Sequence, residues 1–319
     1  RKERNQGFNG SFELITGTPA NYGGAANLNY RHRKVNFFIN YGIAYRVQPG
    51  TGKLYQEVYG TDTTFLQQDN EGSITGFNNN IRGGIDFYFT ETSVLTGSYL
   101  FRRSDATRVT DIEYKNYSFS LLNLDSIETR RQDEEESEPN SEYSLIYKKT
   151  FPEKDHELVA EIKFLDNWES SYQLFTHRYY NPERVEDNSR ATLERSLNDE
   201  YEKQLLFQLD YTKPIGKAGN FETGLRSSSR EMVNDFVVGR RDDAGEFIPL
   251  PGLDNVFLYD ENIHAAYGIL ARKGSRFSYQ AGVRAEWTDV RTTLRETNEV
   301  NPPEYVNLFP RAHITYNLP

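Results

Sequence analysis

The chain has 319 residues, a formal net charge of −10 and no cysteine. The acidic balance argues against a nucleic-acid partner, which would require basic residues. The lack of cysteine favours export to an oxidising compartment, where stray thiols are avoided, with chance or a cytosolic chain as the alternative. No run of 18 apolar residues occurs, so a transmembrane helix is excluded. Only 36% of the residues are hydrophobic although 14% are aromatic, which suits a sheet with one apolar face better than a large packed core.

From the N-terminus onward, segments of about ten residues alternate between apolar and polar side chains, as β-strands do. A tilted strand crosses a bilayer with about 9–11 residues, whereas strands of soluble proteins average about 5–6. The pattern therefore predicts an all-β, antiparallel, up-and-down transmembrane barrel, with a soluble β-sandwich as the alternative. The clearest strands are expected at 35–46, 81–89, 158–165, 205–212, 263–271 and 277–287. Weaker strands, which bring the total to about twelve, are expected at 7–16, 24–32, 93–103, 141–150, 220–231 and 306–318.

The alternation also predicts which side chains face lipid. In 277–287 the apolar set includes Val283, and in 263–271 we assign Ile269 to the apolar set, which leaves His264 and Gly268 on a polar lumen side. His313 has the lumen phase as well. Aromatic residues gather at the ends of the apolar sets, the placement of interfacial girdles; they are Tyr41, Tyr45, Phe87, Phe89, Tyr211, Trp287 and Tyr316.

The connections between strands alternate in length. Tight turns are expected near 33–34, 90–92, 151–155, 214–220 and 272–276, and they mark the periplasmic rim of a barrel. Long polar loops are expected near 47–76, 104–140, 170–198, 232–255 and 291–305, because these segments hold most of the Pro, Gly, Asn and Asp turn signals. These loops would form the extracellular face, where a ligand is selected.

Several short segments resemble a known family. They are Gly7-Phe8-Asn9-Gly10-Ser11, Leu28-Asn29-Tyr30-Arg31, Lys34-Val35-Asn36-Phe37-Phe38, and Leu308-Phe309-Pro310-Arg311-Ala312. In order and spacing they resemble the barrel of TonB-dependent receptors of Bacteroidota-type bacteria, the outer membrane protein β-barrel family.

The resemblance covers essentially the whole chain and implies a location in the cell outer membrane. Because barrels of this family have about 22 strands, residues 1–319 are expected to be a single barrel-domain fragment, the first half of the wall without the plug. The resemblance further implies uptake of a siderophore, glycan or peptide, with energy from the TonB complex acting through the plug. A surface lipoprotein is a further partner that it suggests.

One aromatic and basic stretch is the candidate ligand contact. It comprises Trp168, Tyr172, Phe175, Arg178, Tyr179 and Tyr180. Aromatic rings of this kind stack on sugars or flat chelates, and the alternative is a strand that extends above the membrane with its own packing. The acidic run 133–138 has two interpretations, a loop that binds Ca²⁺ or a cationic ligand and a solvated loop.

The sequence predicts neither an enzyme nor a cofactor. The five histidines form no His-x-His or His-x-x-x-His pair, so no metal site is expected. His177 with Asp166 or Asp187 is the only candidate for a catalytic group at a barrel rim. A structural or adhesive outer-membrane barrel without transport is therefore the main alternative to a receptor, and a rim-site enzyme is a third.

Overall fold

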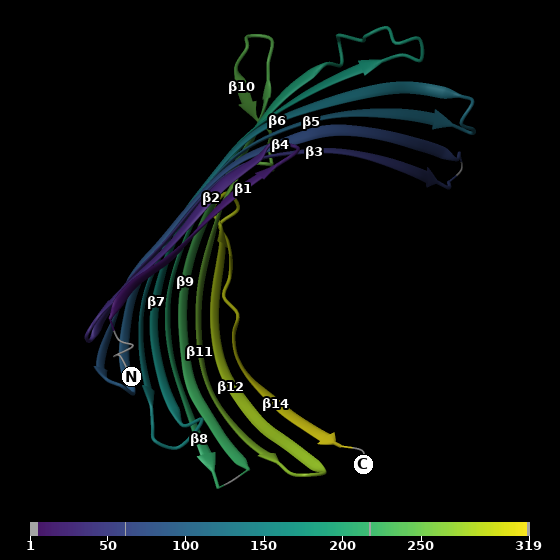
Figure 1. Ribbon diagram of the computed structural model, residues 1–319. Coiled ribbons are helices and arrows are strands. Elements are labelled where there is room, and N and C mark those ends of the chain that lie inside the picture. Colours follow the sequence, from purple (N-terminus) through teal and green to yellow (C-terminus); the bar gives the residue numbers. More distant parts are fainter. Residues whose placement is uncertain (1–5, 61, 217, 318–319) are drawn as a thin grey trace.

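The computed structural model describes residues 6–60, 62–216 and 218–317, and these residues form one antiparallel sheet (Figure 1). The strands follow one another up and down in chain order. Their bounds are β1 (Gly7–Gly17), β2 (Asn21–His32), β3 (Val35–Val58), β4 (Thr64–Thr90), β5 (Ser93–Ser118), β6 (Leu124–Thr150), β7 (Glu157–Tyr180), β8 (Thr192–Ile215), β9 (Gly219–Arg241), β10 (Phe247–Pro249), β11 (Asn255–Lys273), β12 (Phe277–Leu294), β13 (Glu299–Asn301) and β14 (Glu304–Tyr316). Within these described ranges, no helix has the length and apolar character needed to cross a membrane.

The predicted fold class is confirmed: the sheet is all-β, antiparallel and up-and-down. Each of the five predicted tight turns joins two paired strands, and two of them leave only two residues, which are Arg33 and Lys34 between β2 and β3, and Glu91 and Thr92 between β4 and β5. Arg33 has a φ of 51°, the positive φ that the favoured two-residue hairpin turns use. The fourth turn contains Lys217 and the last predicted strand contains Leu318, which both lie outside the described residues.

The two faces of the sheet differ in chemistry. The strand register places a continuous set of exposed apolar side chains on one face, the apolar face. Its members include Phe37, Ile39, Ile85, Phe87, Tyr143, Leu145, Ile162, Leu205, Phe207, Leu225, Leu270 and Val283. The polar face lies opposite and holds hydrogen-bonded groups such as Asn36, Asp86 and Thr96. The set of apolar side chains lies beside the tight turns, and we call this band the apolar belt.

The register corrects the prediction for β11. Gly268 pairs with Val283 and Ile269 pairs with Gly282, and directly opposed residues of a sheet project from the same face. Because Val283 lies on the apolar face and is 49% exposed, Gly268 lies there too and Ile269 lies on the polar face. His264 was also assigned wrongly, since it pairs with Trp287 on the apolar face, and the two rings stack at 5.1 Å. His313 pairs with Gln280 on the polar face, as predicted.

The predicted long loops also need correction, because most of these residues are strand. β3 to β9 have 23 to 27 residues each, more than twice the length needed to cross a bilayer. The connections at their far ends are short: 59–63, 119–123, 181–191 and 242–254, the last interrupted by β10. Residues 291–305 are likewise largely strand, in β12, β13 and the start of β14.

Pro49 shows how a turn residue fits inside a strand. β2 begins at Asn21, opposite Arg46. Among the described residues, the next part of β3 therefore has only Ala20 beside it on that side, whose carbonyl accepts the Val47 N–H at 2.7 Å. The nitrogen of Pro49 points the same way, two residues further on, beyond this end of β2. Proline is tolerated there because the N–H that it lacks would have no strand beside it to accept a hydrogen bond.

The sheet is unclosed over the described residues. β1 pairs with β2, and β14 pairs with β12, but β1 and β14 do not pair with each other. Figure 1 shows the result as a strongly twisted and curved band, with the purple and blue strands at one edge and the yellow β14 at the other.

Candidate functional site

Beyond the apolar belt, the strands β3 to β9 continue as a wall that we call the strand extension. It comprises 47–58, 64–76, 103–118, 124–140, 169–180, 192–200 and 230–241. Neither face of the strand extension is predominantly apolar, so both of its faces meet water or a ligand. Charged groups are abundant on both, and the register decides which of them meet.

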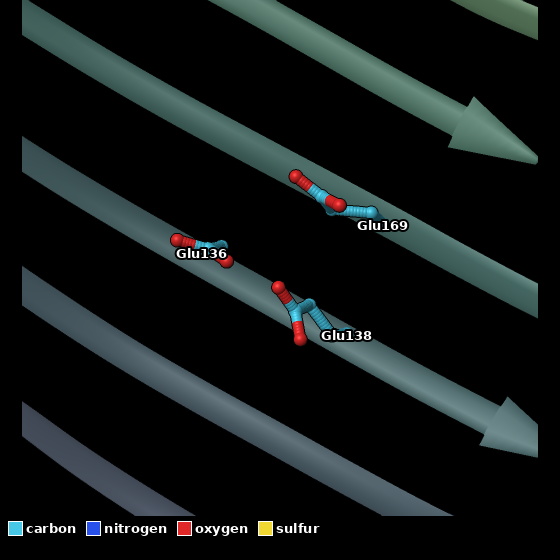
Figure 2. Close-up of side chains that lie close together, drawn as sticks. All are labelled: Glu136, Glu138 and Glu169. Carbon is cyan, nitrogen blue, oxygen red and sulfur yellow. The ribbon is translucent and has the colours of Figure 1, made fainter. Parts of the chain in front are cut away.

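Three carboxylates of the strand extension converge on the polar face. Figure 2 shows Glu136 and Glu138 on β6 and Glu169 on the adjacent strand β7, and one oxygen of each lies within 4.8 Å of the others. Glu134 is only 5% exposed, and it accepts a hydrogen bond from Arg108 Nη1 at 2.8 Å. The acidic run 133–138 is therefore part of β6, not a loop, and alternate members project from opposite faces.

Crowding of these groups disfavours their charged forms. The hydrogen bond with Glu138, burial and the charge of Glu138 raise the pKa of Glu136 to about 7. Burial, followed by the charges of Glu136, Glu200 and Glu134, raises the pKa of Glu169. Carboxylates so close together can share a proton or offer oxygen ligands to a hard cation.

A ladder of ion pairs crosses the opposite face of the strand extension. Glu113 on β5 pairs with Lys115 at 3.0 Å and accepts two hydrogen bonds from Arg184, at 3.0 and 3.1 Å. Arg184 lies in the β7–β8 connection, so this contact ties the connection to β5. The hydrogen bond from Arg184 is the main cause that lowers the pKa of Glu113. Further rungs are Lys53–Asp69, Arg131–Asp111 and Arg131–Asp133.

The six predicted ligand contacts all lie on β7, but the structure does not bring them together in one site. Four of them, Trp168, Tyr172, Arg178 and Tyr180, project from the side continuous with the apolar face, whereas Phe175 and Tyr179 project from the polar side.

Their contacts are correspondingly different. Trp168 stacks on Tyr201 with ring centroids 6.0 Å apart. On the other face, the guanidinium groups of Arg130 and Arg190 lie 4.5 and 4.2 Å above the rings of Phe175 and Tyr179.

The histidine considered for catalysis has a different partner from those proposed. His177 Nδ1 lies 3.2 Å from Glu128 Oε1 on β6. Asp166 lies eleven residues earlier on the same strand and on the other face, so it cannot reach the ring. Asp187 accepts hydrogen bonds from the backbone and side chain of Ser189. The predicted grouping is thus not formed.

Sequence reasoning missed the hydrogen-bonded groups on the polar face of the belt. Asp210 accepts hydrogen bonds from Tyr267 at 2.7 Å and from Gln208 at 2.6 Å, although the three residues come from two strands. On β12, Arg284 Nη2 donates to Glu286 at 2.7 Å. The polar phase of each strand was the available signal, but the pairs across strands needed the register.

Comparison with known protein families gives a match. Residues 149–319, just over half of the chain, match the model of a family described as "Outer membrane protein beta-barrel family". No curated protein matches the chain. The matched residues include β7 to β14, with part of the apolar belt and part of the strand extension.

Proposed function

Since the chain belongs to the outer membrane protein beta-barrel family, we propose that it forms barrel wall in a TonB-dependent receptor that takes up a ligand in a Bacteroidota-type bacterium. The protein lies in the outer membrane. Its apolar face therefore meets lipid and its polar face the lumen. The tight turns mark the periplasmic rim, and the strand extension stands on the extracellular side.

The observation that carries the proposal is the width of the unclosed arc. Twelve long strands lie side by side without closing on themselves. A barrel of about eight strands fills its interior with its own side chains, porins of about 16–18 strands leave an aqueous channel, and transporters of about 22 strands enclose a wide, plugged lumen. An unclosed arc of twelve strands is too wide for the first class and fits the two wider ones, and the hydrogen-bonded polar face suits contact with a plug or with a polar ligand.

The family resemblance supplies the remaining parts of the proposal. Energy would come from the TonB complex acting through a plug. The ligand would be a siderophore, glycan or peptide that meets the lumen side of the strand extension. We propose no covalent chemistry, no cofactor and no nucleic-acid partner for this wall.

Ligand uptake, compared between a strain that lacks the gene and the same strain complemented with it, tests the proposal. We expect labelled ferric siderophore, oligosaccharide or peptide to enter complemented cells but not the deletion strain, and a protonophore to abolish the difference. Glu200→Lys, on the polar face of β8, should change the concentration dependence of uptake. Asp199→Lys, its neighbour on the other face, is the matched control. Uptake of every probe that is independent of both the gene and the protonophore contradicts the proposal.

A second candidate function rests on the far ends of the strands. Apolar side chains are exposed on two neighbouring connections, where Tyr59 is 77% and Leu122 97% exposed, and the Phe119 N–H donates to Thr63 O at 2.8 Å to join them. Such a surface favours contact with another macromolecule, as in an adhesive barrel or a receptor with a surface lipoprotein. Loss of cell attachment with unchanged uptake after Leu122→Ser would favour adhesion.

A further inference from the structure

A groove of about 560 Å³ lies on the lipid side of the wall, immediately outside the apolar belt. Its lining residues come from β3, β4, β5, β6 and β7. The walls are aromatic: Tyr45 and Phe77 stand on one side, and Trp168 and Tyr172 on the other. Each of these four side chains is between 39% and 41% exposed, so their rings are accessible.

The floor of the groove is made of short polar side chains. Phe77, Asp105, Ser137 and Ser170 occupy one register row across β4 to β7. Three strand spacings separate the two aromatic walls at this row, about 14 Å, which is wide enough for two sugar rings. The hydroxyl groups and the Asp105 carboxylate provide hydrogen-bonding partners between the walls.

Among the described residues that line it, the groove offers no free cation to an anionic group, because its one basic lining residue, Arg103, is paired and the lining residues Glu135 and Glu136 are acidic. Arg103 Nε lies 2.9 and 3.0 Å from the two carboxylate oxygens of Asp105, and the Ser137 hydroxyl donates to the same carboxylate at 2.7 Å. The guanidinium is thus already neutralised by its neighbour. Recognition of a phosphate would need an unpaired cation, whereas aromatic faces beside hydroxyl groups suit the alternating apolar and polar surfaces of a sugar.

We propose that this groove binds the sugar headgroup of an outer-leaflet glycolipid. The groove is continuous with the lipid-facing belt, because Ile39, Tyr41 and Tyr45 project from the same face of β3. A lipid whose acyl chains lie against the belt therefore places its headgroup at the groove. The transported ligand is not the occupant, since Trp168 and Tyr172 project away from Glu169 and from the lumen side.

Lipid retention in nanodiscs tests this inference. The protein is assembled with phosphatidylcholine that contains a minor fraction of either a dihexosyl diacylglycerol or phosphatidylglycerol, and the lipids that remain bound after detergent exchange are quantified by mass spectrometry. We expect enrichment of the dihexosyl lipid and none of phosphatidylglycerol. Trp168→Ala should reduce the enrichment by about threefold to tenfold, the effect of one aromatic contact.

Trp287→Ala is the matched control, because Trp287 is a 37% exposed aromatic of the same face at the extracellular end of the apolar run of β12, outside the groove. Its enrichment should equal that of the wild type. If the groove aromatics act only as ordinary interfacial side chains, both lipids should be retained equally, or both variants should lose the same amount of enrichment. Either result overturns the proposal. Retention of phosphatidylglycerol alone would also overturn it, because charge would then be the recognised feature.

Discussion

The register of β11 and β12 predicts that the same substitution at two adjacent residues will have very different effects on stability. Gly268 faces lipid opposite Val283, which occupies the middle of the apolar run from Tyr279 to Trp287. A Cβ at Gly268 would meet no atom within 4 Å, so substitution there tests the surroundings and not the packing. Ile269, the next residue, faces the lumen.

Gly268→Arg should lower the free energy of unfolding by about 2–4 kcal/mol, the cost of arginine on the lipid face near the midplane. That cost corresponds to roughly a 30-fold to 700-fold change in the folding equilibrium. Gly268→Leu should equal or exceed the wild type, because a glycine within a strand contributes no side-chain packing. Ile269→Arg should cost no more than about 1 kcal/mol, since its side chain enters water.

Reversible unfolding by guanidinium in phospholipid vesicles measures these differences, with the midpoint and the slope fitted for each variant. The comparison of Gly268→Arg with Ile269→Arg carries the test, because the same side chain is introduced one residue apart. A larger loss at 269 than at 268 would show that the two faces are exchanged. Equal losses at both positions would show that β11 does not separate lipid from lumen at all.

Two further predictions concern the strand extension. The raised pKa of Glu136, about 7 against an ordinary 4.5, means that the folded protein holds a proton that the unfolded chain releases, so stability should fall as pH rises from about 4.5 to 7. Glu136→Gln should flatten this dependence by on the order of 1 kcal/mol after solvent screening, and an unchanged pH profile of thermal unfolding counts against the shared proton. The pKa of Glu113 is lowered, chiefly by Arg184, so the β7–β8 connection should lose hydrogen-exchange protection as pH falls below 4.5. Arg184→Ala should remove that protection at neutral pH, and full protection in the variant would exclude the tether.

The strands of the belt and the tight turns were predictable because the membrane imposes a strong pattern. Lipid demands an apolar residue at every second position, and a two-residue turn such as Arg33-Lys34 interrupts that pattern visibly. The orientation of β11 was predicted wrongly because both of its sets of alternate residues are apolar or small. Ile263 and Ile269 lie in one set, and Ala266 and Leu270 lie in the other. Alternation alone cannot orient such a strand, and the neighbouring Val283 decides it.

The strand extension was predicted as loops for the opposite reason. Outside the membrane neither face must be apolar, so the periodic signal disappears although the hydrogen bonding continues. Segment 69–72, Asp-Asn-Glu-Gly, is a turn signal by composition, yet it pairs residue by residue with both β3 and β5. Turn propensity is a weak preference that two neighbouring strands override.

The candidate site shows that closeness along the chain does not place two side chains on the same side of the wall. Trp168 and Glu169 are adjacent, and both lie just before one predicted loop, yet the first projects to the lipid side and the second to the lumen. A cluster of aromatic residues in a segment therefore does not define a binding site in a barrel wall. Side chains meet the same environment, lipid or lumen, only when they alternate along one strand and lie opposite one another on neighbouring strands. Under the two proposals above, Trp168 and Tyr172 contact lipid whereas Glu169 faces the transported ligand, so substitutions one residue apart on β7 should affect lipid retention and uptake separately.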